Sequence, residues 1–128
     1  MNYKSAEKNL LSKPESRKDF PFGPDVAVFK VKGKMFATLI NKNNAAHMNL
    51  KCDPYRAAAL RDAFEAVIPG YHMNKLHWNT IILDGSIPPG EIKKMIDHSY
   101  ALVVKGLKKA EKTALLLAYS GEEIFKEL

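Results

Sequence analysis

The chain has 128 residues and a mass of 14.4 kDa, which is the size of a single domain and excludes a multidomain enzyme. Hydrophobic residues make up 46% of the chain and charged residues 27%, so a packed core can form without disulfides or metal ions, and intrinsic disorder is excluded. Lysine and arginine outnumber aspartate and glutamate by 20 to 14, which gives a net charge of +6. This whole surplus lies in residues 1–75, where it favours an anionic partner.

Cysteine use and hydropathy predict where the protein works. A single cysteine, Cys52, cannot form an internal disulfide, and the first residues contain no apolar stretch of the kind that directs secretion. The most hydrophobic run, Thr113 to Tyr119, is far shorter than the ~20 apolar residues that span a membrane. We therefore expect a soluble, cytoplasmic monomer without membrane contact.

Apolar periodicity and turn-forming residues predict the order of the elements. Lys32-Gly33 marks the turn of a β-hairpin. Asp53-Pro54 indicates a helix start, because aspartate caps free N–H groups and proline at the first helical position loses no hydrogen bond. In chain order we expect a helix over 2–12, a loop over 13–24, strands over 26–31, 35–40 and 47–52, a helix over 54–67, a strand over 78–83, a long helix after Pro88-Pro89, a last helix over 108–119 and a frayed acidic tail over 120–128.

The strands are grouped and do not alternate regularly with helices, which indicates an antiparallel sheet. We therefore predict an α+β fold, a two-layer sandwich in which helices pack on one face of an antiparallel sheet. A single domain should span residues 1–128, with its core in residues 25–107. The helix over 54–67 is expected to face the sheet with Ala59, Leu60, Ala63, Phe64 and Val67.

The first candidate site is the hairpin turn, where Lys30, Lys32 and Lys34 cluster around Gly33 and Lys42 lies on the next turn. A β-ribbon with a basic tip can follow a phosphate backbone or enter a groove, because each lysine neutralises a phosphate and releases counterions. The alternative, a solvated turn whose lysines promote solubility, is the commoner outcome for such a tip.

The second candidate is the segment from Tyr71 to Trp78, in which His72, Asn74, Lys75, His77 and Trp78 gather directly after a helix-ending Pro-Gly. These polar groups can contact a phosphate, a base edge or a carboxylate. Equally, the tryptophan can pack in the core while its neighbours satisfy buried backbone groups. His72 and His77 could also hold zinc or nickel together with His47, but no HExxH or CxxC pattern supports a metal site, and none is expected.

Catalytic motifs are missing from the sequence. It contains no GxSxG and no glycine-rich phosphate loop. Cys52 has the pattern of a buried small hydrophobe. His98 lies in the second long helix without an evident partner and is interpreted as a solvated or helix-packing residue. We therefore expect a protein that is not an enzyme and needs no cofactor.

Residues 72–88 carry the most distinctive pattern. The stretch Asn74-Lys75-Leu76-His77-Trp78 is followed by a strand that ends in Leu-Asp-Gly-Ser and by a proline-started helix. In this the chain resembles the YjbR/MmcQ family of small bacterial proteins, whose hallmark is NKxHW followed by LDGS. The resemblance extends to the VFKVKGKMFATL hairpin, the NLKCDP junction and residues 96–100, so it covers most of residues 25–107.

The resemblance implies a frataxin-like (CyaY-like) sandwich and DNA binding through a double wing of β-hairpins. Frataxins bind iron through an acidic first helix, whereas here that helix offers only Glu7 beside Lys4 and Lys8, so no iron site is expected. The positions that match the family's proposed DNA-binding features are Lys30, Lys32, Lys34, His72, Asn74, Lys75, His77 and Trp78.

The leading hypothesis is therefore a DNA-binding protein, accessory to transcription, whose wing lysines hold phosphates of duplex DNA. The alternative is a protein- or small-anion-binding module that uses the His72–Trp78 loop and has no role with nucleic acid. The two differ in geometry, because DNA binding requires the hairpin lysines and this loop to share a face.

Overall fold

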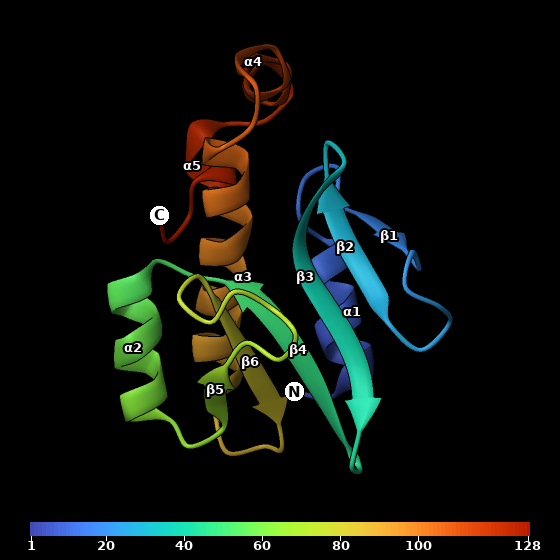
Figure 1. Cartoon of the computed structure of the whole chain (residues 1–128). Coiled ribbons are helices and arrows are strands. Elements are labelled where there is room, and N and C mark those ends of the chain that lie inside the picture. The colour runs from blue at the N-terminus through green and yellow to red at the C-terminus, as the bar shows by residue number, and fades with distance from the viewer.

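Six strands form one antiparallel sheet in the computed structural model, which describes residues 1–128 (Figure 1). Their order in the sheet is β1-β2-β3-β4-β6-β5, and every neighbouring pair is antiparallel, as the grouping of strands predicts. The strands are β1 (Arg17–Asp19), β2 (Ala27–Val31), β3 (Lys34–Lys42), β4 (Ala45–Lys51), β5 (Val67–Pro69) and β6 (Trp78–Leu83).

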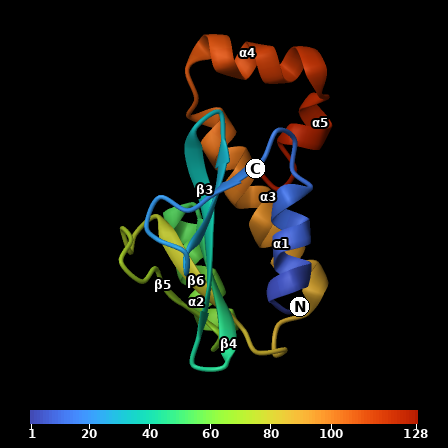
Figure 2. The ribbon, with the colours of Figure 1, turned by 90° about the vertical axis from the view of Figure 1, so that its right-hand side faces the viewer.

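Helices cover one face of this sheet. Figure 2 shows the sheet edge-on, with α1 and α3 beside each other to the right of β3 and β4, while the opposite face, which is toward the viewer in Figure 1, carries no helix. This arrangement confirms the predicted α+β sandwich. None of the helices has the length and apolar character needed to cross a bilayer. The helices are α1 (Tyr3–Leu11), α2 (Pro54–Ala63), α3 (Pro89–Lys105), α4 (Lys109–Ala118) and α5 (Gly121–Ile124).

The core lies between the sheet and α3. Tyr100 of α3 is fully buried, its ring packs edge-on against Phe36 with centroids 5.3 Å apart, and its hydroxyl donates to the Pro14 carbonyl at 2.7 Å. The neighbouring Ser99 hydroxyl donates to the Phe36 carbonyl at 2.6 Å and accepts from the Lys51 amide at 2.9 Å. One turn of α3 therefore fixes β3 and β4 together.

Two short edge strands were not predicted. β1 lies within the expected loop over residues 13–24 and pairs with β2, although all three of its residues are exposed and charged. β5 occupies the end of the expected helix over 54–67, because α2 ends at Ala63 and the chain then returns to pair with β6. Pro69 is compatible with this position, since an edge strand need not use every N–H in a ladder.

The shorter α2 also presents a different face from the one predicted. Ala57 is its buried residue, while Ala59 and Ala63 are exposed. Leu60 and Phe64 are half-buried and pack against the core, and Val67 is buried from β5. Because α2 lies beside β5 at the edge of the sheet, it covers less apolar surface than a central helix would.

The C-terminal residues are ordered, in contrast to the expected frayed tail. Ile124 of α5 is fully buried. His98, expected to have no partner, is 2% exposed; its Nε2 accepts from the Asp53 amide at 3.1 Å and its Nδ1 donates to the Glu127 carbonyl at 2.7 Å. Arg56 forms an ion pair with the Glu127 carboxylate at 3.1 Å. These partners lie too far away in the sequence for a local pattern to reveal them.

Candidate functional site

Five of the six strands of the sheet, all except β1, contain no carboxylate. Residues 26–52, which include β2, β3 and β4, hold five lysines and no aspartate or glutamate. Residues 66–83, which include β5 and β6, hold one lysine and again no acid. Strand alternation directs Lys30, Lys42 and Lys51 to the open face, where the only facing carboxylate, Asp19, comes from the edge strand β1.

The hairpin lysines are less free than their sequence suggests. The Lys32 ammonium lies 3.0 Å from the Glu15 carboxylate, and that of Lys30 lies 3.2 Å from Asp19. Lys34 is exposed and forms no ion pair. The turn itself has positive φ at Lys32 (50°) and Gly33 (78°), the conformation that suits a two-residue hairpin loop.

The predicted segment around NKxHW forms the loop between β5 and β6, over residues 70–77, and crosses in front of the sheet in Figure 1. The Asn74 side chain accepts from the Leu76 amide at 2.9 Å, and the Lys75 ammonium donates to the Gly70 carbonyl at 3.1 Å. From α2, the Arg61 guanidinium donates to the Lys75 carbonyl at 3.3 Å. Asn74 and Lys75 therefore hold the loop's own backbone.

The two ends of the loop are also joined to neighbouring strands. The His77 carbonyl accepts from the Cys52 amide at 2.8 Å, which joins the loop to the end of β4. Gly70 lies directly against Trp78: a Cβ at Gly70 would come within 2.8 Å of the Trp78 Cβ. His72 differs from these residues, because it is exposed, has a φ of 58° and stacks its ring 4.0 Å from that of Tyr71.

The LDGS part of the pattern also has a local structural explanation. The Asp84 carboxylate accepts from the Ser86 hydroxyl at 2.6 Å and from the Ser86 amide at 2.9 Å, and these two hydrogen bonds lower the pKa of Asp84. Gly85 between them has a φ of 87°, which other residues rarely adopt. This motif shapes the turn that leads into α3.

Tyr71, the first residue of the predicted segment, is the centre of the site. Its amide donates to the Thr80 hydroxyl at 2.9 Å and its carbonyl accepts from the Asn49 side chain at 3.3 Å, so the backbone of the loop is anchored on β4 and β6. The ring is 53% exposed, and the Lys42 ammonium lies 3.9 Å from its centroid. Together with His47 these residues line a hollow of about 140 Å³ on the open face.

Lys51, which was not among the candidate residues, could have been found together with Lys42 by one signal. The long stretch without a carboxylate, combined with the period of two along each strand, places their side chains on one face. The structure thus brings Lys30, Lys42, Lys51 and the loop to the same face, whereas Lys32 and Lys34 extend from its end at the β2–β3 turn.

The groups considered for metal binding and nucleophilic chemistry are not assembled. No cluster of three or more histidine, cysteine, aspartate or glutamate side chains is suited to a metal ion. A ring nitrogen of His47 faces the Ala45 carbonyl at 3.2 Å. Cys52 is 4% exposed, as its pattern predicts, and burial raises the pKa of its thiol to about 11. A thiol with this pKa is protonated at neutral pH and is a weak nucleophile.

These observations define a small α+β sandwich with a lysine-bearing open sheet and an anchored loop across it. The chain belongs to the YjbR family, whose family model, described as YjbR, matches residues 11–102. It is 33% identical over 109 residues to the Escherichia coli O157:H7 protein "Uncharacterized protein YbdF", covering 85% of this chain and 89% of that one. It is 39% identical over 88 residues to "Uncharacterized protein YjbR" of Escherichia coli K12, covering 69% and 74%.

Solved structures show the same fold. The crystal structure of Deinococcus radiodurans protein DR2400, described with the domain DUF419, has a TM-score of 0.81 and 36% identity and covers 89% of this chain and 87% of that chain. The crystal structure of the Pseudomonas syringae protein PsR293 has a TM-score of 0.70 and 31% identity and covers 80% and 98%.

Proposed function

We propose that this protein binds duplex DNA, without enzymatic activity, through the open face of its sheet and the β2–β3 turn. The observation that carries the proposal is the separation of charge, since residues 26–52 and 66–83 hold six lysines and no carboxylate. A polyanion that approaches this face meets ammonium groups and almost no opposing charge. Each phosphate that a lysine neutralises releases counterions and so favours binding.

Three lysines are ready to bind phosphate. Lys34, Lys42 and Lys51 form no ion pair within the protein. Lys30 and Lys32 have carboxylate partners at 3.2 Å and 3.0 Å. Each of them must give up this ion pair before it binds a phosphate, so each contributes less to the free energy of DNA binding. We therefore expect modest affinity, with about three to five phosphates neutralised.

The topology supports a shared approach by two hairpins. Trp78 at the start of β6 pairs with Lys51 at the end of β4, and the beginning of β3 runs beside that same end. The β2–β3 turn and the β5–β6 loop therefore leave the sheet at the same end. This agrees with the double wing of β-hairpins that the family resemblance implies. The proposal also includes four further expectations: kinship with the frataxin-like fold, a cytoplasmic location, a monomeric state and an accessory role in transcription.

Within the loop, Tyr71 and His72 are better placed than Asn74 or Lys75 to touch DNA. The polar groups of the latter two already bond to the loop backbone, whereas the rings of the former two are exposed. We propose that the loop orients these rings toward sugar and base edges, while the lysines hold phosphates.

The test is fluorescence anisotropy with a short mixed-sequence duplex at low salt. We expect Lys42→Glu/Lys51→Glu to weaken binding by about ten- to a hundredfold, because it places two carboxylates on the open face. The matched control is Lys4→Glu/Lys8→Glu, which makes the same charge change on exposed positions of α1 and should weaken binding far less. Equal losses in the two variants, or no binding by the unaltered protein, would overturn the proposal.

A further inference from the structure

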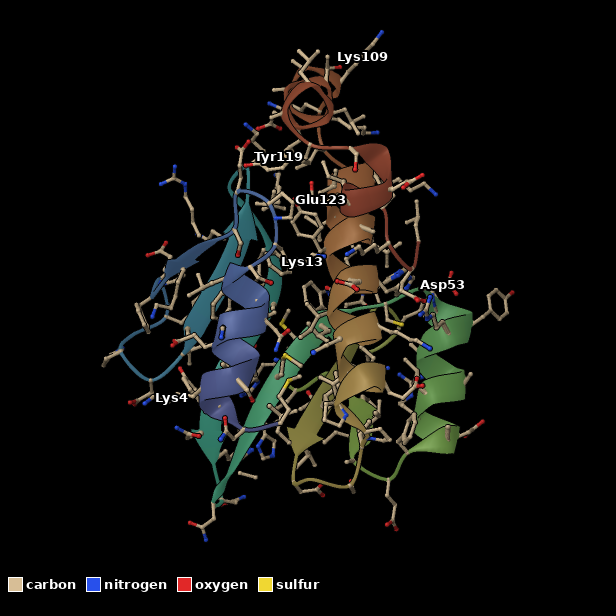
Figure 3. The ribbon with its side chains drawn as sticks, turned by 180° about the vertical axis from the view of Figure 1, so that it is seen from behind. Lys4, Lys13, Asp53, Lys109, Tyr119 and Glu123 are labelled. Atoms are coloured by element: carbon tan, nitrogen blue, oxygen red, sulfur yellow. The ribbon has the colours of Figure 1, made fainter.

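We infer that a second site, a polar hollow between α1, α3 and α5, binds a small oxyanion such as the phosphate group of a small metabolite. The hollow has a volume of about 250 Å³, and Ile96 is the only hydrophobic residue among the nine that line it. It lies in the helical layer, which faces the viewer in Figure 3, away from the open sheet face. It is therefore independent of the proposed DNA surface.

Lys13 provides a buried ammonium group at the floor of the hollow. The residue is 8% exposed, its Nζ donates to the Asp97 carboxylate at 2.6 Å, and the same Nζ lies 5.2 Å from the Tyr100 ring centroid. An ammonium group has three N–H donors, and only one of them has a hydrogen-bond acceptor here. A buried charge is normally fully hydrogen-bonded, so the unused donors leave room for an acceptor from a ligand.

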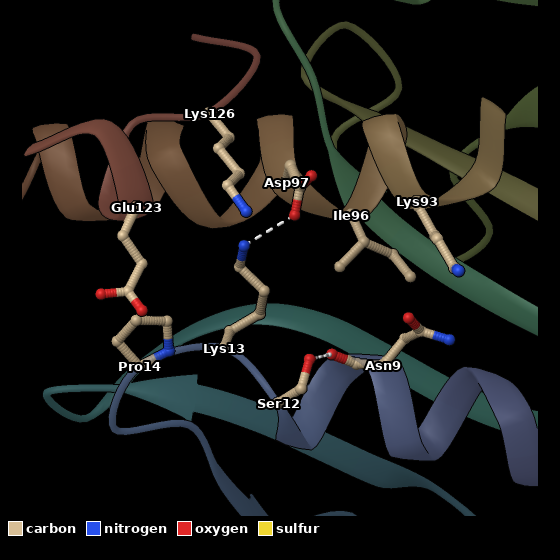
Figure 4. A pocket seen from close by; sticks show the side chains of 9 residues that line it. All are labelled: Asn9, Ser12, Lys13, Pro14, Lys93, Ile96, Asp97, Glu123 and Lys126. Carbon is tan, nitrogen blue, oxygen red and sulfur yellow. Dashed lines mark hydrogen bonds and ion pairs between the residues drawn. The ribbon is translucent and has the colours of Figure 1, made fainter. Parts of the chain in front are cut away.

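Lys126 and Lys93 add two further ammonium groups. Figure 4 shows the Lys126 side chain extending into the hollow from the wall opposite Lys13, so that the two ammonium groups point toward one another. Neither Lys126 nor Lys93 forms an ion pair with any carboxylate of the protein. Like charges that converge in this way repel one another, and an anion placed between them removes the repulsion.

The charges of the lining indicate which ligand fits. Three lysines face two carboxylates, Asp97 and Glu123, so the hollow has one excess positive charge and disfavours a metal cation. Lys13 is paired with Asp97, so Lys93 and Lys126 share the hollow with one other carboxylate, Glu123. One negative charge balances the excess, and the several acceptor oxygens of a phosphate group let it contact more than one ammonium group at once, which the single atom of chloride does not. The volume suits a small molecule, because sites for drug-sized ligands occupy about 300–1,000 Å³.

The three lysines come from three separate parts of the chain. Lys13 follows α1, Lys93 lies in the first turns of α3, and Lys126 follows α5. A ligand held by all three would connect both ends of the chain to the central helix. Because this arrangement exists only in the folded state, binding must raise the stability of the folded protein.

The experiment is thermal unfolding in inorganic phosphate, compared with sodium chloride of equal ionic strength. At phosphate about tenfold above its dissociation constant we expect the melting temperature to rise by about 3–6 °C. Lys126→Met and Lys93→Met should each remove at least half of this rise. The control is Lys94→Met, which removes an equal charge from the same helix at an exposed lysine that pairs with Glu91 and does not line the hollow.

Phosphate titration followed by amide NMR shifts identifies the place of binding. We expect the largest shifts at Lys13, Asp97 and Lys126, both in the unaltered protein and in Lys42→Glu/Lys51→Glu, because the open face takes no part. An equal rise in melting temperature with chloride would contradict the inference. So would a full rise in Lys126→Met, or shifts confined to the open face. Loss of DNA binding in the open-face variant with phosphate binding intact would separate the two proposals.

Discussion

The two faces of the sheet differ in what their side chains do. On the covered face, apolar side chains such as Met48 and Leu50 alternate inward and are buried beneath α1 and α3. On the open face, the same strands present lysines, His47 and the hydrogen-bonded pair Asn49 and Thr80. The comparison indicates that the covered face supplies most of the apolar packing, while the open face carries lysines and one facing carboxylate, Asp19 from β1, and is the surface that we propose binds a polyanion.

Replacing one large ring on each face gives the sharpest contrast in stability. Phe36→Ala should lower the free energy of unfolding by about 3–5 kcal/mol, because it removes a fully buried ring and leaves a cavity beside Tyr100. Tyr71→Ala should cost less than about 1 kcal/mol, since its ring is half-exposed. Urea unfolding of both variants is the measurement. Similar losses in the two would show that the open face is also required for stability.

The loop is anchored to the open face at Gly70, which lies against Trp78, and Gly70→Ala tests this anchor. The new methyl group would lie 2.8 Å from the Trp78 Cβ and 2.9 Å from its carbonyl oxygen, and backbone atoms cannot move aside cheaply. We expect a loss of about 1–3 kcal/mol in urea unfolding. The control is Gly90→Ala, where the added Cβ meets nothing within 4 Å. If Gly70→Ala is as stable as the control, the loop is not anchored as described.

Much of the covered face could be predicted from the sequence, because alternation and helix caps are local signals. Asp53 caps α2 as expected, with its carboxylate accepting from the Arg56 amide at 3.1 Å. The edge strands could not be predicted in the same way. β1 consists of three exposed charged residues without an apolar pattern, and β5 begins only four residues after the end of α2. Neither segment carries a local strand signal, because each forms a strand by pairing with a strand elsewhere in the chain, β2 or β6.

The open face was predicted only in part, for a related reason. The cluster of hairpin lysines is visible in the sequence, but the pairing of Lys32 with Glu15 depends on β1, which the sequence does not reveal. Likewise, NKxHW is recognisable as a pattern, whereas the hydrogen bond from Lys75 to Gly70 is a tertiary detail. Lys42 and Lys51 contribute through the absence of acids around them, which no single motif records.

Lowering the pH should reduce the free energy of unfolding, because His98 becomes protonated. Burial lowers the pKa of His98 below its usual value, so the folded protein binds a proton there less readily than the unfolded chain, whose histidine has a pKa of about 6.5. Stability should therefore be constant above that pH and fall as the pH decreases through it toward the folded value. Urea unfolding at successive pH values measures the fall, which should be smaller in His98→Gln. An equal fall in this variant would assign the effect to other groups.

The exposed ion pair at the hairpin should matter least for stability. Lys32→Met removes a contact with Glu15 between partly exposed side chains, and such pairs contribute about 0–1 kcal/mol. We expect the free energy of unfolding to change by less than about 1 kcal/mol and DNA affinity to fall only slightly, because Lys32 already has an anionic partner. A larger loss of DNA affinity than in Lys42→Met would reverse the ranking of the two lysines.

The difference between the faces is tested most directly by the salt dependence of duplex DNA binding. If the open face neutralises about three to five phosphates, log K should fall linearly with log salt concentration, with a slope between about −2.7 and −4.5. Lys42→Gln should reduce the magnitude of that slope by about 0.9, and Lys4→Gln on α1 should leave it unchanged. A slope near zero, or the same change in both variants, would contradict the assignment of DNA binding to the open face.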